Sequence, residues 1–309
     1  MKDRIIIVGS VALDTIQTPF GKITRGVGGS SVYSALAASF FAPAAVIGVV
    51  GEDFPDDFLK KMEKRGIKTD GIKKVPGKTF FWKGKYSWDL STAITLDTQL
   101  NVFEKFNPSV PEDLRSSRYL FLANIDPVLQ KKVLEQMASP KSAKYTALDT
   151  MNFWIESKKK KIGALLPGLD AILINEAEIR QYTGEHSIIK AAKKLLKTGV
   201  QTVVVKKGEY GVGCFSKAGM FFLPAYPLED AVDPTGAGDS FAGAFMGYLA
   251  SEGKATWANI KKAAAYGTVI SSFTVSGFGV NGLLNLKKSE VIKRYGEFVR
   301  LVHFEDVKI

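Results

Sequence analysis

Short runs of apolar, β-branched residues alternate along the chain with segments whose apolar residues recur at helical spacing. The runs predict strands at residues 5–8, 45–50, 119–122, 145–148, 171–174 and 202–205. The periodic segments predict helices at 31–41 and 56–65, and a later helix that begins near Trp257. Strands that alternate with helices indicate βαβ units, so we expect an α/β fold with a mainly parallel sheet covered on both faces.

Residues 72–98 break this alternation. They are rich in Thr and aromatic residues and predict antiparallel strands at 78–86 and 93–96, set apart from the main sheet. Phe80, Trp82 and Tyr86 are expected on one face of this small sheet and Phe81 on the other. Such a sheet cannot bury both faces alone. Either one face covers a substrate while the other meets a second subunit, or the aromatic side chains all pack on the main domain.

Composition narrows the class of protein. Of the 309 residues, 46% are hydrophobic and 24% charged, as in globular enzymes, and the length allows one large α/β domain or two modest ones. One cysteine and two histidines argue against a disulfide and against a cysteine-built or histidine metal centre. With no signal-peptide pattern and no long apolar run, we expect a cytoplasmic protein without a membrane partner. The net charge of +11 suits an anionic ligand or reflects a lysine-rich surface, and no nucleic-acid motif accompanies it.

The segment 233–245, DPTGAGDSFAGAF, holds the most informative chemistry. Gly236, Ala237 and Gly238 precede an apolar run that reads as a helix, so backbone N–H groups and the helix start predict an anion site. Asp239 places a carboxylate in that site. It suits a base that takes the proton of an attacking hydroxyl in phosphoryl transfer, although Asp also commonly caps helices. From this loop alone both interpretations stay open.

The pattern Asp-x-Thr-Gly-Ala-Gly-Asp resembles the signature of the ribokinase-like (PfkB-type) carbohydrate kinases. Further segments match the family in order over nearly the whole chain. The resemblance implies one ribokinase-like domain over residues 1–309, with a mainly parallel central sheet and a small β-sheet lid. The lid would be inserted from about 13–27 and 72–98.

The resemblance also implies substrate-binding residues. Asp14 follows the first strand and matches an early aspartate of the family, although an isolated Asp is often a turn residue. Gly28 and Gly29 match a pair that touches substrate hydroxyls. Tyr33 stands where the family has an asparagine, so binding typical of ribose or fructose cannot be assumed. The segment 149–152 resembles an Asp-x-Asn segment near substrate and phosphates and adds Asn152.

Nucleotide and metal residues follow in the same way. Asn175 and Glu178 match a motif that organises Mg²⁺ and phosphates through water, and the same spacing is close to a capping box. Lys206 or Lys207 is expected to reach phosphate. A monovalent-cation site is implied at Asp233 and Thr235. The nucleotide-binding candidates are Asn175, Lys207, Gly208, Gly211, Thr235, Gly236, Gly238 and Gly277.

We therefore expect a kinase that moves the γ-phosphoryl group of ATP to a hydroxyl of a sugar or polyol, with Mg²⁺ and in some members K⁺. Asp239 would be the base, with the N–H groups of Ala237 and Gly238 holding the migrating charge. At a helix start the pKa of Asp239 should be depressed. The alternatives are a nucleoside kinase, where Tyr33 and the aromatic lid stack on a base, and a non-catalytic sugar or nucleotide sensor. The lid predicts a homodimer.

Overall fold

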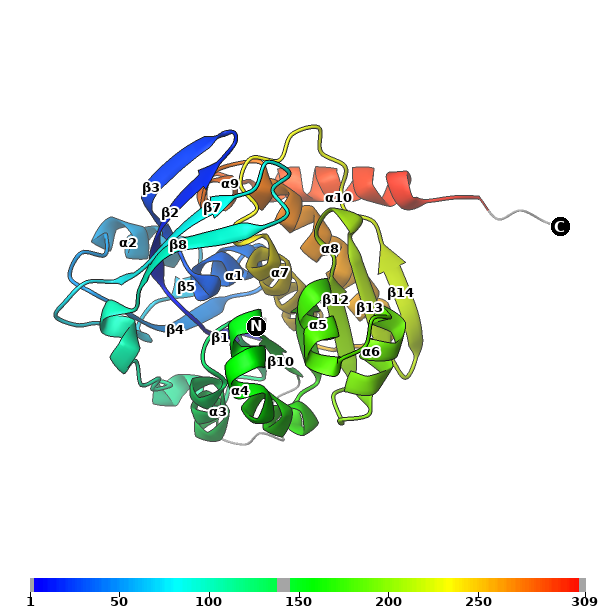
Figure 1. Ribbon diagram of the computed structural model, residues 1–309, viewed down its shortest axis with the longest axis horizontal. Helices are drawn as coiled ribbons and strands as arrows, with labels where there is room; N and C mark the ends of the chain where they lie inside the picture. The colour runs from blue at the N-terminus through cyan, green and yellow to red at the C-terminus, as the bar shows by residue number, and fades with distance from the viewer. Residues whose placement is uncertain (1–2, 138–144, 306–309) are drawn as a thin grey trace.

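An open sheet of ten strands runs through the centre of the computed structural model, which describes residues 3–137 and 145–305 (Figure 1). The order along the sheet is β14-β13-β12-β11-β10-β9-β1-β4-β5, and β6 pairs with the end of β4. All neighbours are parallel except the pairs β12–β13 and β13–β14. The strands are β1 (Ile5–Val8), β4 (Ala44–Val50), β5 (Ile67–Lys68), β6 (Ile72–Lys74), β9 (Tyr119–Leu122), β10 (Tyr145–Asp149), β11 (Ala171–Asn175), β12 (Thr202–Lys206), β13 (Val212–Ser216) and β14 (Gly219–Leu223).

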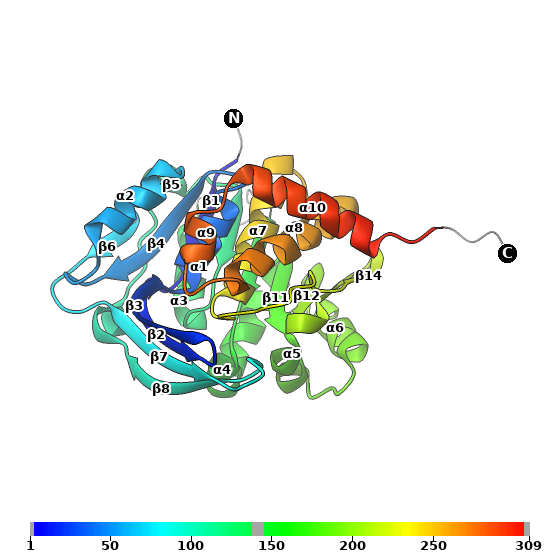
Figure 2. The same cartoon turned by 90° about the horizontal axis from the view of Figure 1, so that it is seen from above.

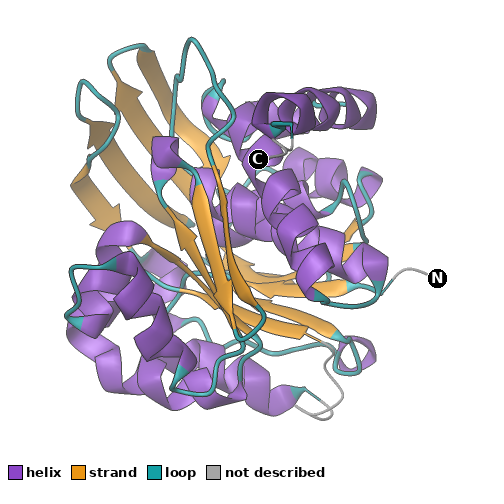
Figure 3. Ribbon diagram, turned by 90° about the vertical axis from the view of Figure 1, so that its right-hand side faces the viewer, coloured by secondary structure: helices purple, strands orange, loops and turns teal. Residues whose placement is uncertain are grey.

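Helices cover both faces of this sheet, as Figure 3 shows. The helices are α1 (Ser30–Ala38), α2 (Asp56–Lys64), α3 (Pro127–Gln136), α4 (Asn152–Leu165), α5 (Glu176–Thr183), α6 (Ile188–Leu196), α7 (Ala237–Glu252), α8 (Trp257–Val275), α9 (Asn281–Leu284) and α10 (Lys288–Val302). Short 3₁₀ turns are η1 (Asn101–Lys105), η2 (Glu112–Leu114), η3 (Leu166–Gly168) and η4 (Gly208–Tyr210). Among the described residues, no helix is both long enough and apolar enough to cross a membrane.

The apolar strands form two cores because successive side chains leave a strand on opposite faces. Ile5 and Ile7 of β1 pack in a cluster with α1, α7, α8 and α10, whereas Ile6 and Val8 pack in a second cluster with α3, α4, α5 and α6. All four side chains are 0% exposed. The uninterrupted apolar runs in the sequence thus reflect strands buried on both faces.

A second sheet stands beside the main one, in the order β3-β2-β7-β8 (Figure 2). Its strands are β2 (Ala12–Thr18), β3 (Gly21–Gly28), β7 (Phe80–Tyr86) and β8 (Ala93–Gln99). Its members come from the segments after the first strand and around residue 80, where the sequence predicts them. Ile72–Lys74 was expected in this sheet and lies instead beside β4 in parallel register. These three residues pair with the main sheet before the chain continues into the second sheet at β7. Their composition alone did not indicate which sheet they join.

The predicted strands and helices agree with the structure to within a few residues. The helix expected at 31–41 ends at Ala38, three residues early. Pro43 follows shortly afterwards, and proline disfavours helical geometry in the residue before it.

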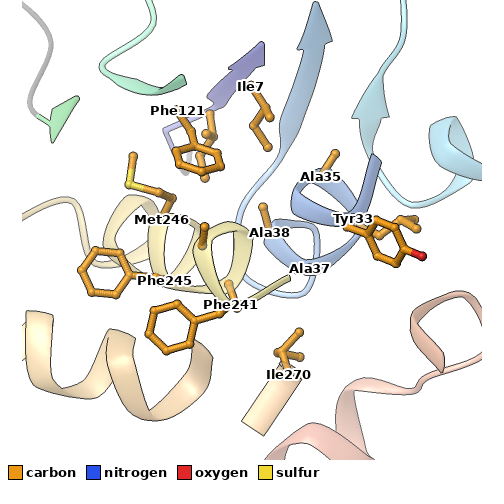
Figure 4. Packing of buried hydrophobic residues seen from close by; sticks show 14 of the residues in the cluster. Ile7, Tyr33, Ala35, Ala37, Ala38, Phe121, Phe241, Phe245, Met246 and Ile270 are labelled. Atoms are coloured by element: carbon orange, nitrogen blue, oxygen red, sulfur yellow. The ribbon is translucent and has the colours of Figure 1, made fainter. Parts of the chain in front are cut away.

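Close packing of α1 against α7 brings two glycine-containing loops together. A Cβ on Gly243 of α7 would lie 2.1 Å from the carbonyl oxygen of Ser34, and one on Gly247 would lie 2.8 Å from Cα of Ala38. Only glycine permits this approach. Figure 4 shows the two helices side by side in the core. The loop before α1 and the loop before α7 therefore lie next to each other in space.

Candidate active site

The loop before α7 presents free backbone donors. Gly236 precedes the helix with a φ of 74°, the left-handed conformation that suits glycine. Within the described residues the N–H groups of Gly238 and Asp239 have no hydrogen-bond partner, as expected for the first turn of a helix. The N–H of Ala237 donates to the carbonyl of Pro234 at 3.1 Å, so this donor is already paired, and its expected role at the migrating charge stays a prediction. The N–H groups of Gly238 and Asp239 are therefore the ones left open to an anion at this helix start.

Tyr33 of α1 supports this loop from below. A Cβ on Gly236 would lie 2.4 Å from the Tyr33 ring, so the glycine rests directly on the aromatic face. The side chain is 1% exposed, and its hydroxyl points away from the apolar cluster in Figure 4. This hydroxyl is buried and has no hydrogen-bond partner among the residues that the structure describes. The tyrosine that replaces the family's asparagine thus has a structural use that the sequence did not indicate. Its contact with substrate stays a prediction.

Asp233 joins the glycine loop to the end of α8. Its carboxylate accepts the N–H of Thr235 at 2.9 Å and the N–H of Gly279 at 2.9 Å. The residue is 0% exposed. The resemblance implies a monovalent-cation site at Asp233 and Thr235, and these residues are therefore adjacent to the segment that follows α8. Each oxygen of the Asp233 carboxylate already accepts a hydrogen bond.

The carboxyl group of Asp239 stands free at the start of α7. Within the described residues it accepts no hydrogen bond, so the structure gives no support to the helix-cap interpretation. Burial, and then the negative charge of Asp149, raise its pKa to about 7, although Lys206 opposes the shift. The expectation of a depressed pKa is wrong, because desolvation outweighs the helix dipole here.

Asp14 faces the same space from β2. A Cβ on Gly28 would lie 1.9 Å from its Oδ2 atom, so the chain needs glycine at that position. The carboxylate accepts the N–H of Gly29, but burial and the charges of Asp233 and Asp239 raise the pKa of Asp14 to about 7. Asp14 therefore converges with the two acids of the glycine loop, which are distant from it in the sequence, as substrate and catalytic carboxylates would.

The second sheet closes over this group through Tyr86. The hydroxyl of Thr235 donates to the hydroxyl of Tyr86 at 3.1 Å. Trp82 is the register partner of Asp14, so the two side chains leave the sheet on the same face, and Tyr86 follows at even spacing. Phe80, Trp82 and Tyr86 thus share the face toward the site, as predicted. The direct link between Tyr86 and the glycine loop was missed, since no local pattern encodes it.

Phe81 points to the opposite face but is not free. It packs against the core cluster that contains its register partner Leu13, and the Arg25 guanidinium lies 5.8 Å from its ring centre. Phe81 is therefore unsuited to carry a subunit contact by itself.

Asn175 and Glu178 form a reciprocal capping box at the start of α5. Asn175 Oδ1 accepts the N–H of Glu178 at 2.8 Å, and Glu178 Oε2 accepts the N–H of Asn175 at 2.9 Å. Burial raises the pKa of Glu178 to about 7 despite the nearby Lys206. The capping interpretation is confirmed, and it leaves the second oxygen of Glu178 available for a metal. No group of three or more His, Cys, Asp or Glu ligands lies within the described residues.

Other candidates lie at the carboxyl ends of the parallel strands. Gly208 has a φ of 56° and open space around it, whereas Gly211 packs tightly on the carbonyl of Leu223, where a Cβ would lie 2.0 Å away. The N–H of Lys207 donates to the carbonyl of Gly211 at 2.8 Å, which closes the turn after β12. Lys206, not Lys207, approaches Gly238.

Two candidates lie at helix ends. Asn152 begins α4 and is exposed. Gly277 follows α8 without a positive φ. Their roles as ligands stay predictions.

Comparison with known proteins identifies the family. Residues 2–286 match the pfkB family carbohydrate kinases. The chain belongs to this family, which confirms the predicted fold and the predicted class, a sugar or nucleoside kinase. A cytidine kinase of Thermococcus kodakarensis is 28% identical over 248 residues, 78% of this chain and 87% of that protein. A deoxyribokinase of Salmonella typhi is 29% identical over 294 residues, 86% of each chain.

Solved structures share the fold at lower identity. The nucleoside kinase of Methanocaldococcus jannaschii matches with a TM-score of 0.75 at 18% identity, over 96% of this chain and 98% of that one. The nucleoside kinase of Burkholderia thailandensis in complex with inosine matches with a TM-score of 0.76 at 16% identity, over 95% and 96%.

Proposed function

We propose that the protein transfers the γ-phosphoryl group of ATP to a hydroxyl of a sugar or nucleoside, with Asp239 as the base. The observation that carries the proposal is the convergence of Asp14 and Asp239 on the free N–H groups that begin α7. A structure described as ribokinase II of E. coli holds ATP and Mg²⁺ on this fold, with a TM-score of 0.78. When bound, ATP supplies the phosphoryl group and Mg²⁺ neutralises part of its charge.

The chain's own residues fit such ligands. Gly236 has no side chain, and the N–H groups of Gly238 and Asp239 are unpaired, so they can hold phosphate oxygens. Glu178 offers one free carboxylate oxygen, which suits Mg²⁺ because this ion commonly takes one or two carboxylates and completes its shell with water and phosphate.

The acceptor hydroxyl would lie between two carboxylates. Asp14 holds it, or a neighbouring hydroxyl, by accepting a hydrogen bond. Asp239 takes its proton as the new bond to phosphorus forms. With a pKa of about 7, Asp239 is a far better proton acceptor than an ordinary aspartate and is still half ionised near neutral pH.

A panel of acceptors tests the proposal. ADP release is measured with ATP and Mg²⁺ against ribose, deoxyribose, other sugars and polyols, cytidine, adenosine and inosine, with Asp239→Asn as the inactive control. We expect acceptor-dependent ADP release from the parent protein alone. If no acceptor stimulates release above the rate of the Asp239→Asn variant, the proposed activity is wrong.

A nucleoside is the second candidate acceptor, and a specific observation favours it. Trp82 and Tyr86 place aromatic side chains on the lid face that covers the site, where a base could stack. The cytidine kinase relative is in keeping with this choice. Trp82→Ala should then raise the KM for a nucleoside far more than the KM for a free pentose. Equal effects on both would favour a sugar.

We also propose a homodimer through the outer side of the lid. The edge strand β8 is mostly exposed, and its Ile94 and Leu96 are 54% and 50% exposed. Exposed apolar edge strands are commonly buried by another chain or element. Analytical ultracentrifugation of the parent and of Ile94→Lys/Leu96→Lys tests it. A parent that sediments as a monomer at all concentrations contradicts the proposal. A cytoplasmic location stays a prediction from the sequence.

A further inference from the structure

Lys206 and Asp149 form a buried ion pair at the carboxyl edge of the main sheet. Lys206 ends β12, Asp149 ends β10, and Nζ lies 2.5 Å from Oδ2. The side chains are 16% and 3% exposed. Removing two charges from water generally costs as much as their attraction returns, so a pair of this kind needs another explanation than stability.

Strand alternation directs both side chains toward α7. Leu173 and Val204 pack in the cluster on the α7 side of the sheet. Asp149 is the register partner of Leu173, and Lys206 lies two residues beyond Val204, so both leave the sheet on that side. Lys206 Nζ lies 3.3 Å from the position that a Cβ on Gly238 would take. The ammonium group therefore lies close to Gly238, whose N–H is unpaired among the described residues.

Lys206 carries one positive charge and lies among three acidic side chains. Asp149, Glu178 and Asp239 all act electrostatically on Lys206, and each interaction favours its charged form. Free N–H groups at a helix start favour an anionic ligand, and the three acids alone would repel it. Lys206 is the neighbouring cation that can neutralise the charge of such a ligand. The flexible stem of lysine can move its ammonium between two neighbouring acceptors.

We propose that Lys206 is a catalytic residue that leaves Asp149 to bind the transferring phosphoryl group, and that Asp149 is the positioning residue that holds it in the free enzyme. This inference rests on the proposed kinase function. Lys206 forms and breaks no covalent bond. It keeps its proton and exchanges one anionic partner for another, while the N–H of Gly238 binds the same oxygens.

The alternative is an ion pair that only supports the sheet. Three variants distinguish the two: Lys206→Met, Asp149→Asn, and the double variant Lys206→Met/Asp149→Asn. The single changes leave a buried charge unpaired and should lower Tm, whereas the double variant has no unpaired partner and should recover it. Lys68→Met is the control, because Lys68 is a partly buried lysine (29% exposed) paired with Asp113 and Asp70 at the far edge of the sheet.

The decisive measurement is nucleotide affinity without an acceptor. Calorimetry with Mg²⁺ compares ADP with the β,γ-imido analogue of ATP, which carries the third phosphate. In Lys206→Met and in the double variant we expect the analogue to bind about 10- to 100-fold more weakly while ADP affinity is retained, since one hydrogen bond to a charged group is lost. Turnover should fall by about 10²- to 10³-fold in both. Lys68→Met should match the parent.

Several results overturn the inference. If the double variant recovers analogue affinity or turnover together with Tm, the ion pair is purely structural and the inference is wrong. Equal losses for ADP and the analogue, or no loss for either, also contradict it. If the parent protein itself binds neither nucleotide, the proposed function fails rather than the role of Lys206.

Discussion

Replacing Asp239 by asparagine should remove activity and, above neutral pH, stabilise the free protein. The carboxyl group has a pKa of about 7 in the fold against an ordinary value of 3.8. Well below pH 3.8 it is neutral in both folded and unfolded chains, so the substitution removes no charge there. As pH rises from 4 to 7, the unfolded chain loses the proton first, and the folded state becomes progressively less stable than it would be with a neutral group.

The size of this effect follows from the shift. About three pK units correspond to about 4 kcal/mol, which is the ceiling. Asp239 is only partly buried and part of the cost is screened by solvent, so we expect a gain of about 1–2 kcal/mol at pH 8. For a chain of 309 residues that gain corresponds to a rise in Tm of about 1.5–3 °C. Turnover should fall by about 10² to 10⁴, the usual contribution of a positioned acid–base group.

The assay is thermal unfolding of parent and Asp239→Asn without ligands at pH 4.5, 6, 7 and 8, together with ADP release at pH 8. Asp57→Asn is the matched control, because Asp57 also lies in the first turn of a helix but its hydrogen bond to Lys61 lowers its pKa. The control should not gain stability as pH rises. A variant that is less stable than the parent at every pH would mean that Asp239 caps its helix, and near-normal turnover would remove it as the base.

Three further predictions follow from the same site. First, kcat/KM should rise with pH through about 7 as Asp239 ionises, and a profile that is flat from pH 5.5 to 8.5 would contradict this. Second, Gly236→Ala should cost about 2 kcal/mol or more in urea unfolding and most of the turnover, because its Cβ would meet the Tyr33 ring at 2.4 Å in a backbone with positive φ; a parent-like variant would show that the loop readily moves. Third, Glu178→Gln should raise the Mg²⁺ concentration needed for half-maximal rate, while the capping hydrogen bond to Asn175 is kept. A change in Tm alone would leave only the capping role.

Much of the fold could be predicted because its signals are local. A strand buried on both faces must be apolar without interruption, so Ile5–Val8 and Tyr119–Leu122 were recognised at their observed bounds. Trp257 was recognised as a helix start, where the Thr256 side chain caps the backbone of Asn259. Ile72–Lys74 was misplaced, because pairing with β4 depends on a partner more than twenty residues away.

The sequence by itself determined the strand–helix order and the residue types of the anion loop, since both are encoded by neighbours along the chain. Only the tertiary structure decided the electrostatics. The pKa of Asp239 rises because burial and Asp149, from a strand ninety positions earlier, outweigh the local helix dipole. The same holds for Lys206 beside Gly238 and for Tyr33 beneath Gly236. Each effect depends on distance in space, and a charge or a ring acts on whatever the fold brings within a few ångströms.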